Sequence, residues 1–285
     1  MTTMKKIISA SRRTDLPACH YEWFQNTLQN EYAEICNPRF KEIKYRVTLS
    51  PDNVHSMVLW SKDFRNVLHN PKYLENYNLY FQYTINNYAK TLEPFAPSYR
   101  ESIGTLEGML DKYRPEQFNI RFDPIVISVC GETQPTPEAP AKARLNVFEG
   151  LCRDLAGLGM RGCRITTSYL AIYRNVRRNM NMANIDIIHP NPDEQKAMAK
   201  ELAAIALHYG FALYSCACPL LSEVEGVETG SCIDGLLLQE LFGGKVSKAR
   251  DTGQRKFCNC TKSSDIGSYD RVCRFKCVYC YAAGG

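Results

Sequence analysis

Three cysteines near the C-terminus have the spacing best suited to chemistry in this 285-residue sequence. Cys273, Cys277 and Cys280 form a C-x3-C-x2-C pattern among aromatic and basic residues. A [4Fe–4S] cluster usually takes four cysteine thiolates, so three leave one iron open to a ligand that is not protein. The pattern therefore predicts a cluster that acts on a bound small molecule. A zinc knuckle completed from upstream and buried thiols without a metal are the alternatives.

A second group of cysteines lies further upstream in the last quarter of the chain. Its members are Cys216, Cys218, Cys232, Cys258 and Cys260. Four thiolates can close a tetrahedral set around zinc or fill an iron–sulfur cluster. We take Cys216, Cys232, Cys258 and Cys260 as ligands of a second iron–sulfur cluster or a zinc ion, and leave Cys218 as the spare. The alternative is a purely structural group that pins the end of the chain onto the fold.

Composition and the start of the chain indicate a cytoplasmic protein. No apolar run approaches the roughly 20 residues that span a bilayer, and no long apolar stretch marks a secretory signal. The cytoplasm keeps thiols reduced, so metal ligation explains clustered cysteines better than disulfides do. The net charge of +5 permits an anionic partner such as nucleic acid but does not require one.

Short apolar runs alternate with helical patterns along most of the chain. The expected strands are Lys5–Ala10, Ser56–Trp60, Leu79–Ile85, Phe118–Phe122, Cys163–Thr167 and Phe211–Ser215. Apolar residues at helical spacing lie between them, beginning with a helix around Tyr21–Leu28. Strands that alternate with helices indicate parallel βαβ units. We predict an α/β fold, specifically a partial (βα)6 TIM-type barrel, with a doubly wound open sheet as the alternative.

The sequence also predicts one further helix, one surface loop and one insertion. A helix is expected with Asp193 as its N-cap and Gly210 as its stop. Gln134–Ala141 is rich in proline and reads as a surface loop, and Tyr169–Pro192 reads as an insertion that contains a short basic helix.

Regular patterning ends after a helix expected near Gly235–Phe242. We therefore expect residues 1–242 to form the barrel. Residues 243–285 are expected to form an irregular, cysteine-rich iron–sulfur arm packed on the barrel mouth.

The carboxyl ends of the expected strands carry charged residues. Barrel enzymes place their active sites at these ends. Arginine forks bind carboxylates and phosphates through two hydrogen bonds, which suits a charged ligand. We therefore predict that the catalytic site includes Arg12, Arg13, Asp15, Arg121 and Asp123. Surface ion pairing of the arginines with Asp15 and Asp123 is the alternative.

With Tyr279 before its last cysteine, the C-terminal motif resembles that of radical S-adenosylmethionine enzymes, which carry it after the first strand of a partial (βα)6 barrel. The whole chain resembles the bacterial family DUF1848, whose C-terminal cysteines have been likened to that motif. The matching stretches are Ile8–Asp15, Arg121–Ile125, Cys232–Asp234, Gln254–Arg255, Cys258–Cys260, Ser264–Gly267 and Cys273–Ala282.

The resemblance implies that Cys273, Cys277 and Cys280 hold the cluster and that S-adenosylmethionine binds its open iron. Reduction would then yield a 5′-deoxyadenosyl radical that takes hydrogen from an unidentified substrate, with ferredoxin or flavodoxin as electron donor. The expected cofactor-binding residues are Tyr279 and Lys62. Tyr279 would lie near the adenine. Lys62 follows the second expected strand, where those enzymes have a Gly-Gly-Glu run that binds the amine and this chain does not.

The rival reading is a non-catalytic iron–sulfur or zinc protein. It would be an electron carrier or a metal-stapled nucleic-acid-binding module, and the basic stretch Arg174–Arg178 favours the latter slightly. A zinc-dependent hydrolase is a weaker option. Catalytic zinc usually takes histidine and carboxylate ligands, and no histidine lies near the C-terminal motif.

Overall fold

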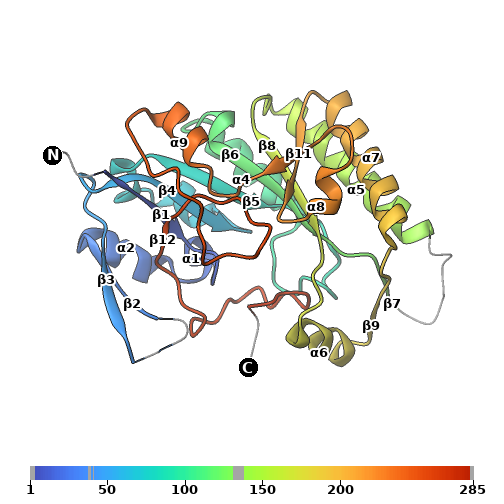
Figure 1. The fold of residues 1–285 in the computed structure, drawn as a ribbon, viewed down its shortest axis with the longest axis horizontal. Coiled ribbons are helices and arrows are strands. Elements are labelled where there is room, and N and C mark those ends of the chain that lie inside the picture. The colour runs from blue at the N-terminus through green and yellow to red at the C-terminus, as the bar shows by residue number, and fades with distance from the viewer. Residues whose placement is uncertain (1–3, 38–39, 41, 131–137, 283–285) are drawn as a thin grey trace.

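The computed structural model describes residues 4–37, 40, 42–130 and 138–282. Its centre is a parallel sheet of eight strands in the order β11-β10-β8-β6-β5-β4-β1-β12 (Figure 1). These are β1 (Lys6–Ala10), β4 (Val54–Ser61), β5 (Leu79–Thr84), β6 (Phe118–Ile125), β8 (Arg164–Tyr169), β10 (Ala212–Cys216), β11 (Val227–Gly230) and β12 (Ser264–Asp265). All but β12 follow chain order across the sheet, as successive βαβ units do.

The helices occupy the crossovers and the flanks of the sheet. They are α1 (Leu16–Cys19), α2 (Tyr21–Gln29), α3 (Arg65–His69), α4 (Tyr99–Leu110), α5 (Glu138–Gly157), α6 (Arg174–Met182), α7 (Pro192–His208), α8 (Pro219–Ser222) and α9 (Gly235–Phe242), with single 3-10 turns η1 (Leu74–Asn76) and η2 (Pro115–Gln117). Helices α2, α4, α5 and α7 supply the largest hydrophobic core together with one face of the sheet.

The two faces of the sheet have different partners because side chains alternate along each strand. Ile8 on β1 and Phe81 on β5 point into the core shared with those helices. Their neighbours Ile7 and Tyr80 point the other way, into a smaller core formed with α9 and the cysteine-rich segment. The segment that follows α9 therefore covers the face that the other helices leave open.

That segment, residues 243–285, is called the arm below, and its structure is described over residues 243–282. It crosses in front of the sheet from α9 towards α6 (Figure 1). Within it, β12 pairs in parallel with β1, with Ile8 opposite Ser264 and Ser9 opposite Asp265. Gly267 comes so close to the loop after β1 that a Cβ atom there would lie 1.9 Å from Ser11 Oγ. The arm is thus hydrogen-bonded to the first strand of the chain.

The predicted α/β class and all six predicted parallel strands are confirmed, each within two or three residues of the expected bounds. The helices expected near 21–28 and 235–242 and the short basic helix, α6, are also confirmed. Two antiparallel pairs were not predicted, β2 (Tyr32–Cys36) with β3 (Lys44–Thr48) and β7 (Ser128–Cys130) with β9 (Ile185–Ile187).

Two local predictions are wrong in detail. The N-cap of α7 is Asn191, not Asp193, because the Asn191 side chain accepts hydrogen bonds from the backbone N–H groups of Asp193 at 2.9 Å and Glu194 at 3.0 Å. Proline at the first helical position suits this earlier start. The loop expected over Gln134–Ala141 lies partly outside the described residues, and from Glu138 onward it is helix α5.

Candidate metal and cofactor site at the carboxyl edge of the sheet

The C-terminal motif lies against the first crossover of the sheet. Cys277 is buried, whereas Cys273 and Cys280 are half-buried. The backbone N–H of Cys280 donates to the carbonyl of Cys277 at 3.0 Å, which closes a tight turn between the two. The three cysteines pack in one apolar cluster with Phe275 and with Ala18 of α1. The motif from the end of the chain is thereby held beside the segment that follows β1.

Cys19, at the end of α1, is the sulfur nearest to the motif in that crossover. Its Sγ lies 3.9 Å from Cys273 Sγ. The backbone N–H of Arg274 donates to Cys19 Sγ at 3.4 Å. The contact with Cys273 lowers the pKa of the Cys19 thiol against the effect of burial. Cys19 was not among the predicted ligands. Its position nine residues after β1 was the available signal, since that segment ends at the same edge.

Tyr279 and Lys62, the two predicted cofactor-binding residues, contact each other. Lys62 Nζ donates to the Tyr279 hydroxyl at 3.0 Å and to Glu93 Oε1 at 2.8 Å. Asn86 Nδ2 also donates to the Tyr279 hydroxyl at 3.0 Å, and that hydroxyl in turn donates to Glu93. The network joins the exits of β4 and β5 to the arm.

The charges of this network are matched inside the protein. Burial by itself lowers the pKa of Lys62, but the charges of Glu93 and Cys277 raise it above its ordinary value. Burial by itself raises the pKa of Glu93, but Lys62 and the hydrogen bonds hold it below its ordinary value. Lys62 is therefore a cation beside Cys277. Burial raises the pKa of the Cys277 thiol to about 12, and the charge of Lys62 acts against this rise.

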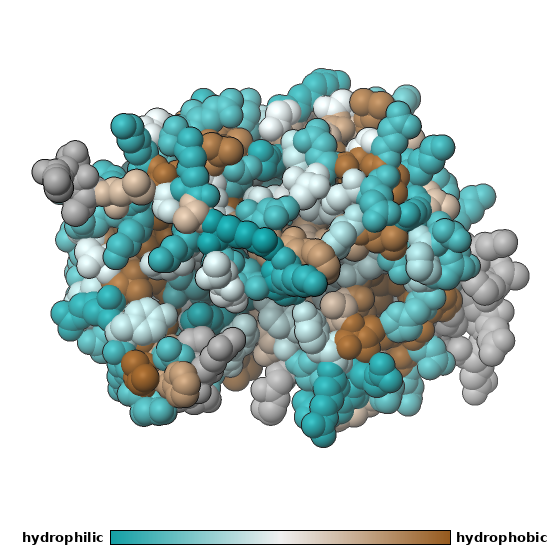
Figure 2. All heavy atoms as spheres, viewed as in Figure 1, coloured by the Kyte–Doolittle hydropathy of each residue, from teal (hydrophilic) through white to brown (hydrophobic). Residues whose placement is uncertain are grey.

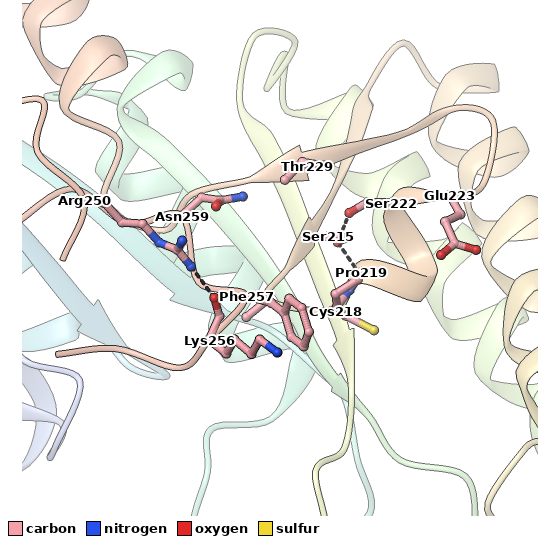
Figure 3. Close-up of a pocket in the computed structure, with 11 residues that line it drawn as sticks. Ser215, Cys218, Pro219, Ser222, Glu223, Thr229, Arg250, Lys256, Phe257 and Asn259 are labelled. Atoms are coloured by element: carbon pink, nitrogen blue, oxygen red, sulfur yellow. Dashed lines mark hydrogen bonds between the residues drawn. The ribbon is translucent and has the colours of Figure 1, made fainter. Parts of the chain in front are cut away.

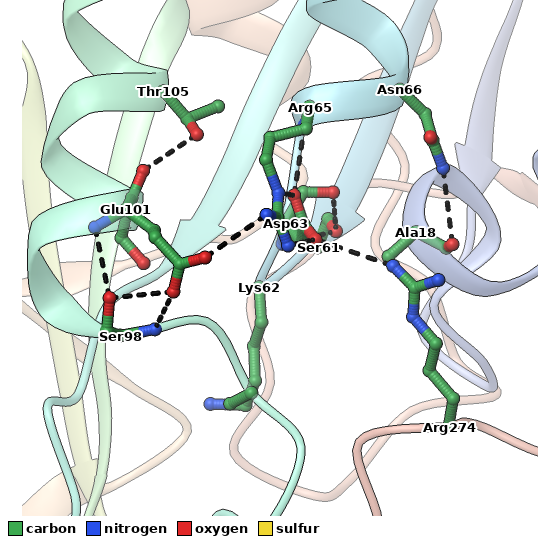
Figure 4. Close-up of polar contacts among 12 residues, drawn as sticks. Ala18, Ser61, Lys62, Asp63, Arg65, Asn66, Ser98, Glu101, Thr105 and Arg274 are labelled. Atoms are coloured by element: carbon green, nitrogen blue, oxygen red, sulfur yellow. Dashed lines mark hydrogen bonds and ion pairs between the residues drawn. The ribbon is translucent and has the colours of Figure 1, made fainter.

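Asp15 joins the β1 exit to the β4 exit. Its carboxylate caps α1 by accepting from Ala18 N–H at 2.9 Å, and it also accepts from Ser61 Oγ at 2.8 Å and from Lys62 N–H at 3.0 Å. Burial raises the pKa of Asp15 to about 6, against the lowering effect of these hydrogen bonds. Neighbouring Asp63 binds Arg65 and, at 3.4 Å, Arg274 of the arm (Figure 4).

The second cysteine group, which includes two cysteines of the arm, packs with α9 in the smaller core. Cys216 Sγ and Cys232 Sγ are 3.1 Å apart. Cys260 Sγ accepts from Ile233 N–H at 3.4 Å. Contacts of Cys260 with Cys232 and with Cys258 continue the chain of thiols. All four predicted ligands are buried, while Cys218, the predicted spare, is only half-buried.

Two arginines face this group. Arg121 Nη1 donates to Cys232 Sγ at 2.8 Å, and Arg121 is ion-paired with Asp123. Hydrogen bonds from Cys216 and Cys260, followed by the charge of Arg121, hold the pKa of Cys232 well below its ordinary value. Arg12 pairs with Asp251 at 3.3 Å, yet its buried Nη1 has no hydrogen-bond partner. Buried cations directed at sulfur favour thiolates over neutral thiols.

The other predicted catalytic residues have structural partners. Arg13 Nη1 donates to the Gly267 carbonyl at 3.1 Å. Asp123 also accepts from Ser168. The ion pairs that form are Arg121 with Asp123, and Arg12 with Asp251 and Asp265, so Asp15 has none of the expected arginine partners among the described residues. A catalytic role for these five residues stays a prediction.

Neither cysteine group is preformed around a metal. Within residues 4–37, 40, 42–130 and 138–282, no three cysteine, histidine, aspartate or glutamate side chains already surround one metal-ion position. A Zn–S bond of about 2.3 Å puts tetrahedral sulfur ligands about 3.8 Å apart. The 3.1 Å between Cys216 and Cys232 is shorter than this, so these side chains must separate to share a metal. The donor chemistry fits thiophilic metals, because every cysteine of both groups is a free thiol.

A family model described as "Domain of unknown function (DUF1848)" matches residues 7–282. This chain belongs to that family. No curated protein and no solved structure matches it. In this DUF1848 protein, none of the helices in the described part of the chain is long and apolar enough to cross a bilayer.

A hollow of this DUF1848 chain lies beside the second cysteine group. It has a volume of about 370 Å³ and opens at the carboxyl ends of β10 and β11. Figure 3 shows Lys256 and Phe257 of the arm on one side, with Cys218 and Pro219 on the other. Arg250 fixes the arm here by donating to the carbonyl oxygens of Cys258, at 2.8 Å, and Lys256. The hollow is large enough for a small organic ligand.

Proposed function

We propose that this protein is an iron–sulfur enzyme of the radical S-adenosylmethionine type. The observation that carries the proposal is the position of the arm, which brings Cys277 and Tyr279 to Lys62 at the exit of β4. Barrel enzymes place catalysis at this edge of a parallel sheet. A motif at the end of the chain thus lies at the edge where an N-terminal motif would lie.

The proposal includes a partial (βα)6 barrel as the scaffold. Parallel strands in chain order, with helices against one face and the arm against the other, support that arrangement. Free thiols in both cysteine groups support a reducing, cytoplasmic setting. A ferredoxin or flavodoxin is the proposed electron donor.

Cys273, Cys277 and Cys280 would hold a [4Fe–4S] cluster, and Cys216, Cys232, Cys258 and Cys260 a second cluster or a zinc ion. A cluster bound there would supply, when reduced, the electron needed to cleave S-adenosylmethionine. Lys62 opposes the rise that burial causes in the pKa of Cys277, and it fixes the hydroxyl of Tyr279. Arg121 stabilises negative charge on Cys232. The buried surroundings of Cys277 and Tyr279 exclude water from the site.

The second candidate function is a non-catalytic electron carrier or zinc-stapled module, and Cys19 favours it. A fourth thiolate on the C-terminal site would leave no open iron for a cosubstrate. The 3.9 Å between Cys19 Sγ and Cys273 Sγ is also close to the spacing around a tetrahedral zinc ion.

Metal analysis and spectroscopy separate the two candidates. The protein is purified without oxygen, and iron, sulfide and zinc are measured, with electron paramagnetic resonance before and after S-adenosylmethionine. If the proposal is right, the reduced protein gives a cluster signal that changes when S-adenosylmethionine is added. The wild-type protein also forms 5′-deoxyadenosine, and the Cys277→Ala variant does not. Zinc in place of iron, or a signal that S-adenosylmethionine leaves unchanged, would refute it.

The Cys19→Ala variant tests the second candidate directly. Under the proposal it retains the iron content and the response to S-adenosylmethionine, just as the control Cys36→Ala does. If Cys19 is a ligand, only Cys19→Ala alters the signal or the metal content.

A further inference from the structure

The positive charge of this protein is concentrated in the arm. Residues 243–285 contain nine lysines and arginines and three aspartates, a net charge of +6. The other 242 residues contain 26 basic and 27 acidic residues, a net charge of −1. The basic character of the whole chain is therefore a property of one segment, and that segment lies across one face of the molecule.

Most of this charge lies at the surface of the molecule. Eight of the nine basic side chains of the arm are exposed, and only Arg271 is half-buried. In α6, at the far end of the arm, Arg174, Arg177 and Arg178 are exposed as well. Figure 2 shows hydrophilic side chains in a band across the middle of this face, where the arm crosses. Like charges so close together repel one another, so the surface favours a polyanion.

Exposed aromatic rings lie among these cations. Tyr173, Phe257, Tyr269 and Tyr281 are 43%, 54%, 50% and 50% exposed, and the rings of Tyr173 and Tyr281 are 6.0 Å apart. Lys256 lies over Phe257, with its Nζ 5.5 Å from the ring centre. Apolar surface that gathers in one exposed patch with a polar rim is typical of interaction sites. A purely electrostatic surface would not need them.

The hollow beside Phe257 adds a concave site to this surface. Its lining combines the aromatic ring with Lys256, Arg250 and Asn259, which offer positive charge and amide hydrogen bonds. The carboxylate of Glu223 also lines it and is paired with Lys196. Its volume of about 370 Å³ is within the range of pockets that hold small organic ligands. One nucleotide matches this chemistry, with a base against the ring and a phosphate near the lysine.

We propose that the arm, α6 and this hollow form a binding surface for single-stranded nucleic acid. Aromatic side chains that stack on bases, set in a positively charged track, are the shared features of such surfaces. A duplex would hide its base faces from Tyr173, Phe257 and Tyr281, so a single strand is the better fit. The surface extends past both cysteine groups and does not depend on which metal they hold.

The test is fluorescence anisotropy with labelled 20-nucleotide oligouridylate and oligothymidylate. A 20-base-pair duplex and vesicles containing phosphatidylserine are measured as comparison ligands. We expect both single strands to bind more tightly than the duplex, with affinity that falls steeply with salt as phosphate contacts are lost. Binding to vesicles alone, to the duplex equally well, or to nothing at 50 mM salt would overturn the inference.

Variants separate stacking from general charge. Phe257→Ala and Tyr173→Ala, both at exposed positions, should each weaken binding about 5-fold or more, because stacking is worth about 1–3 kcal/mol per base. Tyr45→Ala is the control, since Tyr45 is 41% exposed on β3, outside the arm. Equal behaviour of all three would refute the proposed surface. Measuring apo and reconstituted protein keeps this outcome separate from any failure of the proposed radical chemistry.

Discussion

The ion pair between Lys62 and Glu93 gives the sharpest stability prediction. Lys62→Met removes the cation and leaves the Glu93 carboxylate, whose side chain is 6% exposed, with Asn86 and Tyr279 as its remaining donors. Glu93→Gln leaves the Lys62 ammonium, 14% exposed, without a counter-charge. Each change breaks a pair that links the arm to the exit of β4.

The expected cost follows from burial. Breaking one partner of a buried ion pair costs about 3–5 kcal/mol, because the remaining charge stays desolvated. For Lys62→Met we expect about 3 kcal/mol, the low end, since two hydrogen bonds still satisfy Glu93. At about 2 °C per kcal/mol for a chain of this size, the unfolding midpoint falls by about 6 °C.

The assay is urea unfolding followed by tryptophan fluorescence, with the double variant Lys62→Met/Glu93→Leu included. Replacing both charges by apolar groups should recover most of the loss, since the desolvation penalty disappears with the charges. The matched control is Lys196→Met, which breaks the exposed pair of Lys196 with Glu223 at 2.6 Å. That pair is expected to contribute only about 0–1 kcal/mol.

The effect should also depend on pH in a defined direction. The folded-state pKa of Glu93 is lowered, so the pair stabilises the protein above the ordinary carboxyl pKa of about 4.3, and this contribution is lost as pH falls further. The gap between wild type and Lys62→Met should therefore shrink in acid. Equal costs for Lys62→Met and Lys196→Met at pH 7, or a double variant no better than either single one, would refute the reasoning.

Three further predictions concern the arm and the two groups it joins. Gly267→Ala should lower the midpoint of thermal unfolding by several degrees, because the added Cβ would collide with the loop after β1. Gly104→Ala is the control, since its Cβ would meet open space and the midpoint should not change. Arg121→Met should weaken metal retention by the second cysteine group about 10- to 100-fold, since it removes the donor to Cys232. Competition with a chelator measures the retention, and an unchanged value would contradict a role for this contact. The pKa of Asp15 is raised to about 6, so its protonated form stabilises the fold at low pH and that contribution is lost as pH rises from about 4 through 6. Asp15→Asn should remove this part of the pH dependence of the urea midpoint, and parallel profiles would count against it.

The repeating elements could be predicted because their signals are local. Short apolar runs identified β1 and β5 from the sequence, and apolar residues at helical spacing identified the helices between the strands. The antiparallel pair of β2 and β3 was missed because β3 is mostly exposed and carries no apolar alternation. The N-cap of α7 was misplaced by two residues because both Asn191 and Asp193 are favourable capping types.

The cysteine groups were visible in the sequence, but their surroundings were not. Spacing alone singled out Cys273, Cys277 and Cys280 and the four upstream cysteines. That Cys19 lies 3.9 Å from Cys273 depends on a contact across 254 residues. Likewise, Asp265 accepts from Arg12 N–H at 2.9 Å and from Ser9 Oγ at 2.9 Å only because β12 pairs with β1.

The sequence by itself thus determined which residue types are available for chemistry, since thiols, arginines and helical or strand periods are properties of short stretches. The tertiary structure decided which of them meet. Lys62 and Tyr279 are 217 residues apart, and their 3.0 Å contact exists because the arm returns over the carboxyl ends of the strands. No local pattern specifies that return, because it depends on contacts of the arm with segments far away in the sequence, such as β1 and the end of β4.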